Sequence, residues 1–151
     1  MQYAVVVLSV VVVGCGTAPP GEGAPIEATC EAPALARAVQ LERAADCAKV
    51  ERKLGLALGL LSEAGLSGHW DSVTVQVRAV DQWETPLGTA VGEYVPWTRT
   101  AYVDRNMTSL VHELVHHHLC VTEGCSPNHA GWEERGFNDI ERRYWSLLAG
   151  P

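Results

Sequence analysis

The sequence has few basic residues and no apolar run long enough to cross a membrane. Its 11 Lys and Arg are outnumbered by 18 Asp and Glu, so the net charge is −7, and no block of basic residues stands out. We therefore expect no nucleic-acid partner, because phosphate binding needs a basic surface. The nearly continuous apolar stretch at residues 4–13 is well short of the about 20 residues that span a bilayer.

This apolar stretch has the length and composition of the core of a secretion signal. It ends in Val12-Val13-Gly14-Cys15. These residues resemble a bacterial lipobox, which implies cleavage after Gly14 and a lipid on Cys15. We therefore predict a signal peptide over residues 1–14 and attachment to a membrane of the cell envelope through the lipid. An uncleaved apolar anchor or an ordinary secretion signal is the alternative.

The remainder of the chain has room for one small domain. Residues 15–29 are rich in Pro, Gly and Ala, which predicts a flexible tether. About 120 residues follow, enough for a single hydrophobic core and not for two. We therefore place one domain at residues 30–151, and we expect it to be a monomer.

The cysteines fit an oxidising compartment. If Cys15 carries the lipid, an even number remains, namely Cys30, Cys47, Cys120 and Cys125. Three pairings are possible, and we favour Cys30 with Cys47 and Cys120 with Cys125, since the second pair flanks a short turn. The first pair requires a broken helix, because a straight helix over residues 34–46 would be about 20 Å long.

One segment carries the chemistry that we expect of this domain. Residues 109–119 contain His112-Glu113-Leu114-Val115-His116, a His-Glu-x-x-His motif. On a helix, His112 and His116 lie one turn apart on the same face, where both imidazoles can reach one cation. Glu113 is placed to accept a proton from water that the cation activates. Apolar residues fill most of the remaining circumference, so we expect the helix to be buried nearly all round.

A catalytic zinc site needs a third protein ligand and one open position. We choose His129 as the third ligand of a single Zn²⁺, because it follows His116 by a loop long enough to turn back. Glu133 and Glu134 are the alternatives. If they do not bind the metal, these two acids are either partners that orient a ligand imidazole or acids of a first helical turn.

Other residues of the region have weaker claims on the metal. Cys120 and Cys125 could bind it together with His116, although oxidation would compete with this. His69 could approach it, but a packed surface pair with its Trp neighbour is the commoner case. We expect His117 to be structural, with assistance to catalysis as the alternative.

The motif and the stretch after it resemble one family. His129-Ala130-Gly131-Trp132 is similar to the third-ligand segment of SprT-like metallopeptidases, in which a His-Glu-x-x-His helix is followed by a loop and a further His. The resemblance covers residues 109–132 and implies a zincin-like domain that hydrolyses peptide bonds. No basic or zinc-ribbon segment accompanies it, so it does not extend to nucleic-acid association.

The rest of the domain predicts a small α+β scaffold. Residues 33–64 show helical spacing of apolar side chains, which indicates a long or interrupted helix, or helix pair, that covers a sheet. Residues 72–79 alternate as a strand does, and residues 81–93 predict a loop or irregular hairpin. Residues 94–104 can be extended, and their free edge is a candidate site for a peptide substrate.

Two helices complete the predicted fold. We expect the motif helix to begin after Asn106 or Thr108 as its N-cap. A last helix should run from Trp132 to the end of the chain, with Glu141 on its outer face. The sheet that they cover is predicted to be short and mixed or antiparallel. Tyr102 and Tyr144 are the candidates for a donor that stabilises a developing oxyanion.

These observations predict a zinc-dependent peptidase of the cell envelope, lipid-anchored or secreted, that acts on peptides or proteins. In this prediction His112, His116 and His129 hold the zinc ion, and Glu113 is the general base. Two alternatives stay open. One is a lipid-anchored domain that binds zinc without turnover, and the other is an amidase that acts on cell-wall peptides.

Overall fold

The structure is a computed structural model that describes residues 24–35, 37–66, 69–85, 88–126 and 128–150. The predicted signal peptide, Cys15 and most of the predicted tether lie outside the described residues. None of the described helices combines the length and the apolar composition that a bilayer crossing requires.

A mixed five-stranded sheet organises the domain. β2, β3 and β7 run parallel to one another, and β1 and β6 pair antiparallel with β2 and β7 at the two edges. In order across the sheet the strands are β1 (Ala28–Cys30), β2 (Val39–Leu41), β3 (Thr74–Val77), β7 (Thr100–Val103) and β6 (Gly92–Val95). β1 thus begins within the last residues of the predicted tether.

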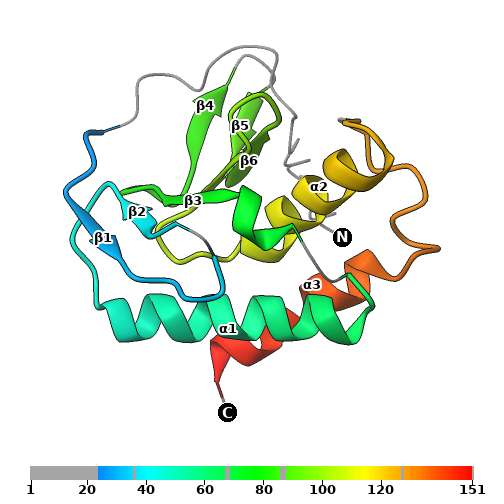
Figure 1. Cartoon of the computed structure of the whole chain (residues 1–151), viewed down its shortest axis with the longest axis horizontal. Helices are drawn as coiled ribbons and strands as arrows, with labels where there is room; N and C mark the ends of the chain where they lie inside the picture. The colour runs from blue at the N-terminus through cyan, green and yellow to red at the C-terminus, as the bar shows by residue number, and fades with distance from the viewer. Residues whose placement is uncertain (1–23, 36, 67–68, 86–87, 127, 151) are drawn as a thin grey trace, which may run out of the picture.

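Three α-helices and two small elements complete the fold. α1 packs against α2 and α3, and α2 also packs against β6 and β7, so α2 lies between the sheet and the other helices (Figure 1). The elements are α1 (Cys47–Glu63), the 3₁₀ helix η1 (Trp70–Ser72), the hairpin β4 (Trp83–Thr85) and β5 (Gly88–Ala90), α2 (Leu110–Glu123) and α3 (Phe137–Ala149). The predicted α+β class is confirmed.

The predicted helix over residues 33–64 is wrong in its first half. α1 begins only at Cys47, where the Asp46 side chain accepts a hydrogen bond from the Ala48 amide and so caps the helix. Before it, Val39 and Leu41 are buried in β2, which hydrogen-bonds to β1 and β3. Strand pairing and burial therefore override the helix propensity of this Ala-rich stretch.

The strands after α1 follow the sequence patterns. The alternating stretch at residues 72–79 contains β3, the irregular hairpin within residues 81–93 is β4 and β5, and residues 94–104 include β7 and the end of β6. The side chains of β3 and β7 that face the helices, Val75, Val77, Ala101 and Val103, are buried in one core. The buried side of α2 packs against this core.

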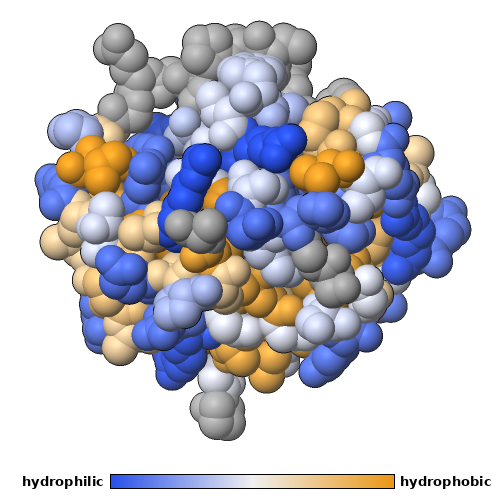
Figure 2. Space-filling model, viewed as in Figure 1, coloured by the Kyte–Doolittle hydropathy of each residue, from blue (hydrophilic) through white to orange (hydrophobic). Residues whose placement is uncertain are grey.

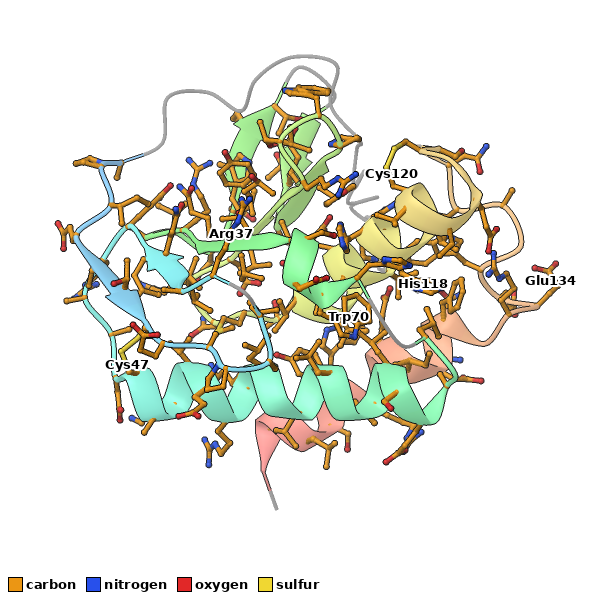
Figure 3. All side chains as sticks on the ribbon, in the orientation of Figure 1. Arg37, Cys47, Trp70, His118, Cys120 and Glu134 are labelled. Carbon is orange, nitrogen blue, oxygen red and sulfur yellow. A yellow bond between two sulfur atoms is a disulfide. The ribbon has the colours of Figure 1, made fainter. Side chains whose placement is uncertain are left out.

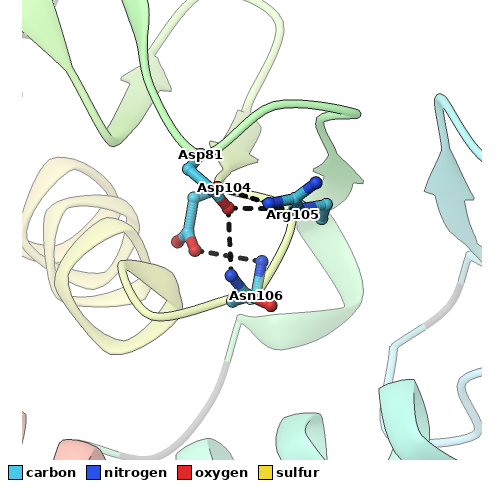
Figure 4. Close-up of polar contacts among 4 residues, drawn as sticks. All are labelled: Asp81, Asp104, Arg105 and Asn106. Carbon is cyan, nitrogen blue, oxygen red and sulfur yellow. Dashed lines mark hydrogen bonds and ion pairs between the residues drawn. The ribbon is translucent and has the colours of Figure 1, made fainter.

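The N-cap of α2 is Ser109 and not the predicted Asn106 or Thr108. The Asp104 carboxylate accepts hydrogen bonds from the Ser109 amide at 2.9 Å and from the Asn106 amide at 3.0 Å. Figure 4 shows this carboxylate beside Asn106, whose side chain donates to Asp81. An acid five residues upstream thus binds the free amide at the start of α2 and positions the motif helix.

Both predicted disulfides are present. Cys30 pairs with Cys47 across a Cα–Cα distance of 5.3 Å, which is possible because no helix separates them, and Cys120 pairs with Cys125 at the end of α2. Disulfides persist in oxidising compartments and are rare in the cytosol, so they indicate a location outside the cytoplasm.

Candidate metal centre

Three histidine side chains converge on one point. His112 and His116 lie one turn apart on α2, and His129 comes from the loop between α2 and α3. The Nε2 atom of His116 is 3.2 Å from Nε2 of His112 and 3.0 Å from Nε2 of His129. Two nitrogens that each lie 2.0–2.1 Å from one tetrahedral zinc ion are about 3.3 Å apart. The three histidines therefore lie close enough to bind a single metal ion.

The hydrogen-bonding capacity of the three rings favours a cation over a purely hydrogen-bonded cluster. A neutral imidazole nitrogen either donates one hydrogen bond or accepts one. Nε2 of His116 makes two short contacts, so a proton can satisfy only one of them. A cation at the centre receives the lone pairs of all three nitrogens and satisfies both contacts. The arrangement thus fits a metal better than it fits protons.

The protonation of the cluster also suits metal binding. Burial, followed by the neighbouring His112 and His129, lowers the pKa of His116 to about 2. Burial and His112 likewise lower the pKa of His129. Both rings are therefore neutral at physiological pH, which is the form that binds a metal.

Glu141 on α3 orients the first of these rings. Its Oε1 lies 2.7 Å from Nδ1 of His112, and the two side chains are only 13% and 15% exposed. Since a carboxylate accepts, Nδ1 of His112 donates this hydrogen bond, and Nε2 on the other side of the ring points into the cluster. Glu141 was expected on the outer face of the last helix, and this expectation is wrong.

Trp132 closes the inner side of the cluster. Its ring centroid lies 4.6 Å from that of His112, 4.9 Å from that of His116 and 4.5 Å from that of His129. Trp132 is 3% exposed and packs against Phe137 in the core, whereas His129 is exposed. The indole therefore forms an apolar floor on which the three rings rest, and solvent reaches the cluster from the side of His129.

Glu113 lies on the side of α2 that faces β6. It is completely buried, and its two carboxyl oxygens have no hydrogen-bond partner among the described residues. Burial, and then the negative charge of Glu141, raise its pKa well above the ordinary carboxyl value. The carboxyl fits there because position 92 is glycine, since a Cβ at Gly92 would collide with Glu113 Oε1.

The remaining predicted residues lie elsewhere. Glu133 and Glu134 are exposed in the turn before α3 and do not belong to the group of potential ligands, and Figure 3 shows Glu134 at the periphery. Glu141, and neither of these two acids, contacts a ligand imidazole. Cys120 and Cys125 are joined to each other, which leaves no thiolate for a metal.

His117 joins α2 to the rest of the domain. Its Nδ1 is 2.9 Å from the Tyr94 hydroxyl of β6, and its Nε2 is 2.9 Å from the His69 carbonyl oxygen. These contacts lie on the sheet side of α2, so they support the structural role that we expected. The side chain of His69 is outside the group of potential ligands.

The two tyrosines proposed as oxyanion donors are engaged away from the cluster. Tyr144 is buried and donates to the Met107 carbonyl at 3.1 Å, and burial raises its pKa. Tyr102 lies near the Arg78 guanidinium on the far side of the sheet. Neither hydroxyl faces the three imidazoles.

Comparisons of the chain with models of protein families, with curated protein sequences and with solved structures find no match. The site is therefore interpreted from its own geometry.

Proposed function

We propose that this protein is a zinc-dependent peptidase of the cell envelope, of the zincin type that the SprT-like resemblance implies. The observation that carries the proposal is the convergence of three imidazoles, two of them on the same helix as a buried glutamate. Three histidine ligands suit Zn²⁺, and three protein ligands leave a fourth position open for a reactant. The exposure of His129 puts that position on the solvent side.

Each residue of the site has its own role in this proposal. When bound, zinc would polarise the scissile carbonyl and make the attacking water more acidic. His112, held by Glu141, and His116, held on the Trp132 floor, keep the ligand nitrogens in place. Glu113 takes the proton of the attacking water on a carboxyl oxygen and delivers it to the leaving amine. The peptide bond breaks as the C–O bond to the water oxygen forms.

The substrate in this proposal is an extended peptide. β6 is the edge strand of the sheet and packs against α2, so a peptide added along β6 would pass beside the motif helix. The proposed lipid on Cys15 would hold the enzyme at a membrane of the envelope. The two disulfides agree with that compartment.

The experiment that tests the proposal uses the whole purified chain on an unfolded protein. We expect cleavage that stops on chelation, returns with one equivalent of zinc and is abolished in Glu113→Gln, while this variant still binds zinc. Glu134→Gln is the matched control, because Glu134 is exposed and does not belong to the group of potential ligands. Cleavage that persists in Glu113→Gln or in the presence of chelator would refute the assignment.

One observation favours a second function, a lipid-anchored domain that binds zinc without turnover. Glu113 is completely buried against Gly92 and Ser109, so a water molecule must enter before the carboxyl can act as a base. One equivalent of bound zinc, together with no chelator-sensitive cleavage of any protein or peptide, would favour this function. A cell-wall amidase shares the chemistry of the peptidase, and cleavage of purified muropeptides instead of unfolded protein would identify it.

A further inference from the structure

A second candidate site lies at the carboxyl ends of the parallel strands. A cavity of about 220 Å³ opens where the carboxyl ends of β2, β3 and β7 meet. Its lining consists of Arg43, Ala44, Ala45, Val77, Arg78 and Arg105. In sheets with parallel strands this edge is where ligands commonly bind, because the loops that leave the strands converge there.

Three arginines reach this cavity from three adjacent strands. Arg43 follows β2, Arg78 follows β3 and Arg105 follows β7, so the parallel topology brings together residues that are far apart in the chain. This is a local cluster of guanidinium groups in a protein whose net charge is −7. Guanidinium groups match the oxygens of phosphate and carboxylate groups in geometry and charge.

Two acids near the cavity, Glu42 and Asp81, form ion pairs with its arginines. Glu42 Oε1 lies 2.8 Å from Arg78 Nε, and its carboxylate also accepts hydrogen bonds from Gln76 and from the Ala79 amide. Asp81 binds Arg105 in a two-point ion pair. Figure 4 shows this pair beside the start of α2. Within the described part of the chain no ion pair involves Arg43, and the Glu27 carboxylate accepts a hydrogen bond from the neighbouring Ala44 amide.

Arg78 supplies an independent indication of a ligand. Its side chain is only 8% exposed, and its Nη1 is buried without a hydrogen-bond partner among the described residues. Its guanidinium also lies over the Trp83 ring, with Cζ 4.8 Å from the centroid, which fixes its orientation. A buried donor without a partner costs free energy, and an anion that enters the cavity would accept a hydrogen bond from Arg78 Nη1.

The start of α1 adds to the positive electrostatic potential at the cavity. Ala44 and Ala45 lead directly to the N-cap Asp46 of this 17-residue helix. The N-terminus of a helix carries a partial positive charge and favours anions. Figure 2 shows that hydrophilic and hydrophobic residues are interspersed over the face that it draws.

We propose that this cavity binds a phosphate group. Three guanidinium groups that approach from separate strands suit a tetrahedral anion with several acceptor oxygens, whereas a carboxylate offers two. The site requires no metal and shares no residue with the histidine cluster, so it goes beyond the proposed peptidase function. The bound group is either free inorganic phosphate or the phosphate of a phosphomonoester.

Isothermal titration calorimetry of the whole chain tests this at constant ionic strength, with inorganic phosphate, phenyl phosphate and acetate as probes. We expect one phosphate per chain. The Kd should increase about tenfold in Arg43→Gln, since a charge-assisted hydrogen bond is lost. Arg52→Gln is the matched control, because Arg52 is exposed on α1 outside the cavity. Neither arginine is buried, so both variants should remain folded, and their circular dichroism spectra verify this.

The arms of the experiment separate the possible outcomes. Tighter binding of phenyl phosphate than of phosphate identifies a phosphomonoester as the ligand, and the reverse identifies the free anion. The affinity should not change after treatment with chelator, which distinguishes this site from the histidine cluster. The proposal is overturned if no saturable binding occurs, if acetate binds as tightly as phosphate, or if Arg43→Gln and Arg52→Gln weaken binding equally.

Discussion

Replacement of Glu141 by alanine should weaken zinc binding by about ten- to hundredfold. The Glu141 carboxylate accepts the Nδ1 proton of His112 at 2.7 Å, and both side chains are largely shielded from water. A charge-assisted hydrogen bond of this kind contributes about 1.5–3 kcal/mol, and each 1.4 kcal/mol corresponds to a tenfold change in affinity. Without it, the His112 ring can rotate and its Nε2 lone pair is no longer held toward the cluster.

The assay is a competition titration of zinc against a chromophoric chelator with known affinity. Glu141→Gln should show a smaller loss than Glu141→Ala, because the amide oxygen still accepts the hydrogen bond without the charge. Glu134→Ala is the control, since this acid precedes the same helix and is exposed. Equal zinc affinities in Glu141→Ala and Glu134→Ala would refute the orienting role. The thermal unfolding midpoint of each variant shows whether a loss of affinity reflects a loss of fold.

Two predictions concern stability. Gly92→Ala should destabilise the fold by about 1–3 kcal/mol, because the new Cβ would collide with Glu113 and lie 2.7 Å from Ser109 Oγ. Gly55→Ala should instead stabilise α1 by about 0.5–1 kcal/mol, since no atom lies within 4 Å of a Cβ at this position. Urea unfolding measures both, and equal effects would contradict the packing that we describe. Replacement of both Cys30 and Cys47 by serine should cost about 3 kcal/mol, because the bridge closes a long loop. A urea midpoint that does not change would show that this bridge does not restrain the unfolded chain.

Local patterns in the sequence were sufficient where a segment's neighbours agree with its propensity. The motif helix, a strand within residues 72–79 and a last helix are all present, although β3 is buried on both faces and the last helix begins at Phe137 and not at Trp132. Residues 34–46 were predicted wrongly, since their Ala content favours a helix while β2 within them pairs with the nearby β1 and with β3, which is distant in the chain. The preferred Cys30–Cys47 pairing already required a break in this helix, and the break is the strand β2.

The candidate site was likewise predictable only where local spacing determines the position of a residue. The spacing of His112 and His116 follows from helical geometry, and the loop length made His129 a reasonable third ligand. Glu141 was missed although its spacing indicated it: it lies four residues after Phe137 and three before Tyr144, both buried, so it shares their face of α3. The place of Gly92 beside Glu113 depends on the pairing of β6 with β7 and has no local signal.

The central claim is that three imidazoles hold a single divalent ion. X-ray absorption spectroscopy of the zinc-loaded chain measures this directly, because the scattering pattern of imidazole gives both the number of rings and their distance. We predict three imidazole nitrogens at about 2.0–2.1 Å and one oxygen ligand from solvent. One zinc per chain in the wild type, and a loss of one ring in His129→Ala, complete the expected result. A chain that binds no zinc, or a spectrum with fewer than three imidazoles in the wild type, would contradict the account.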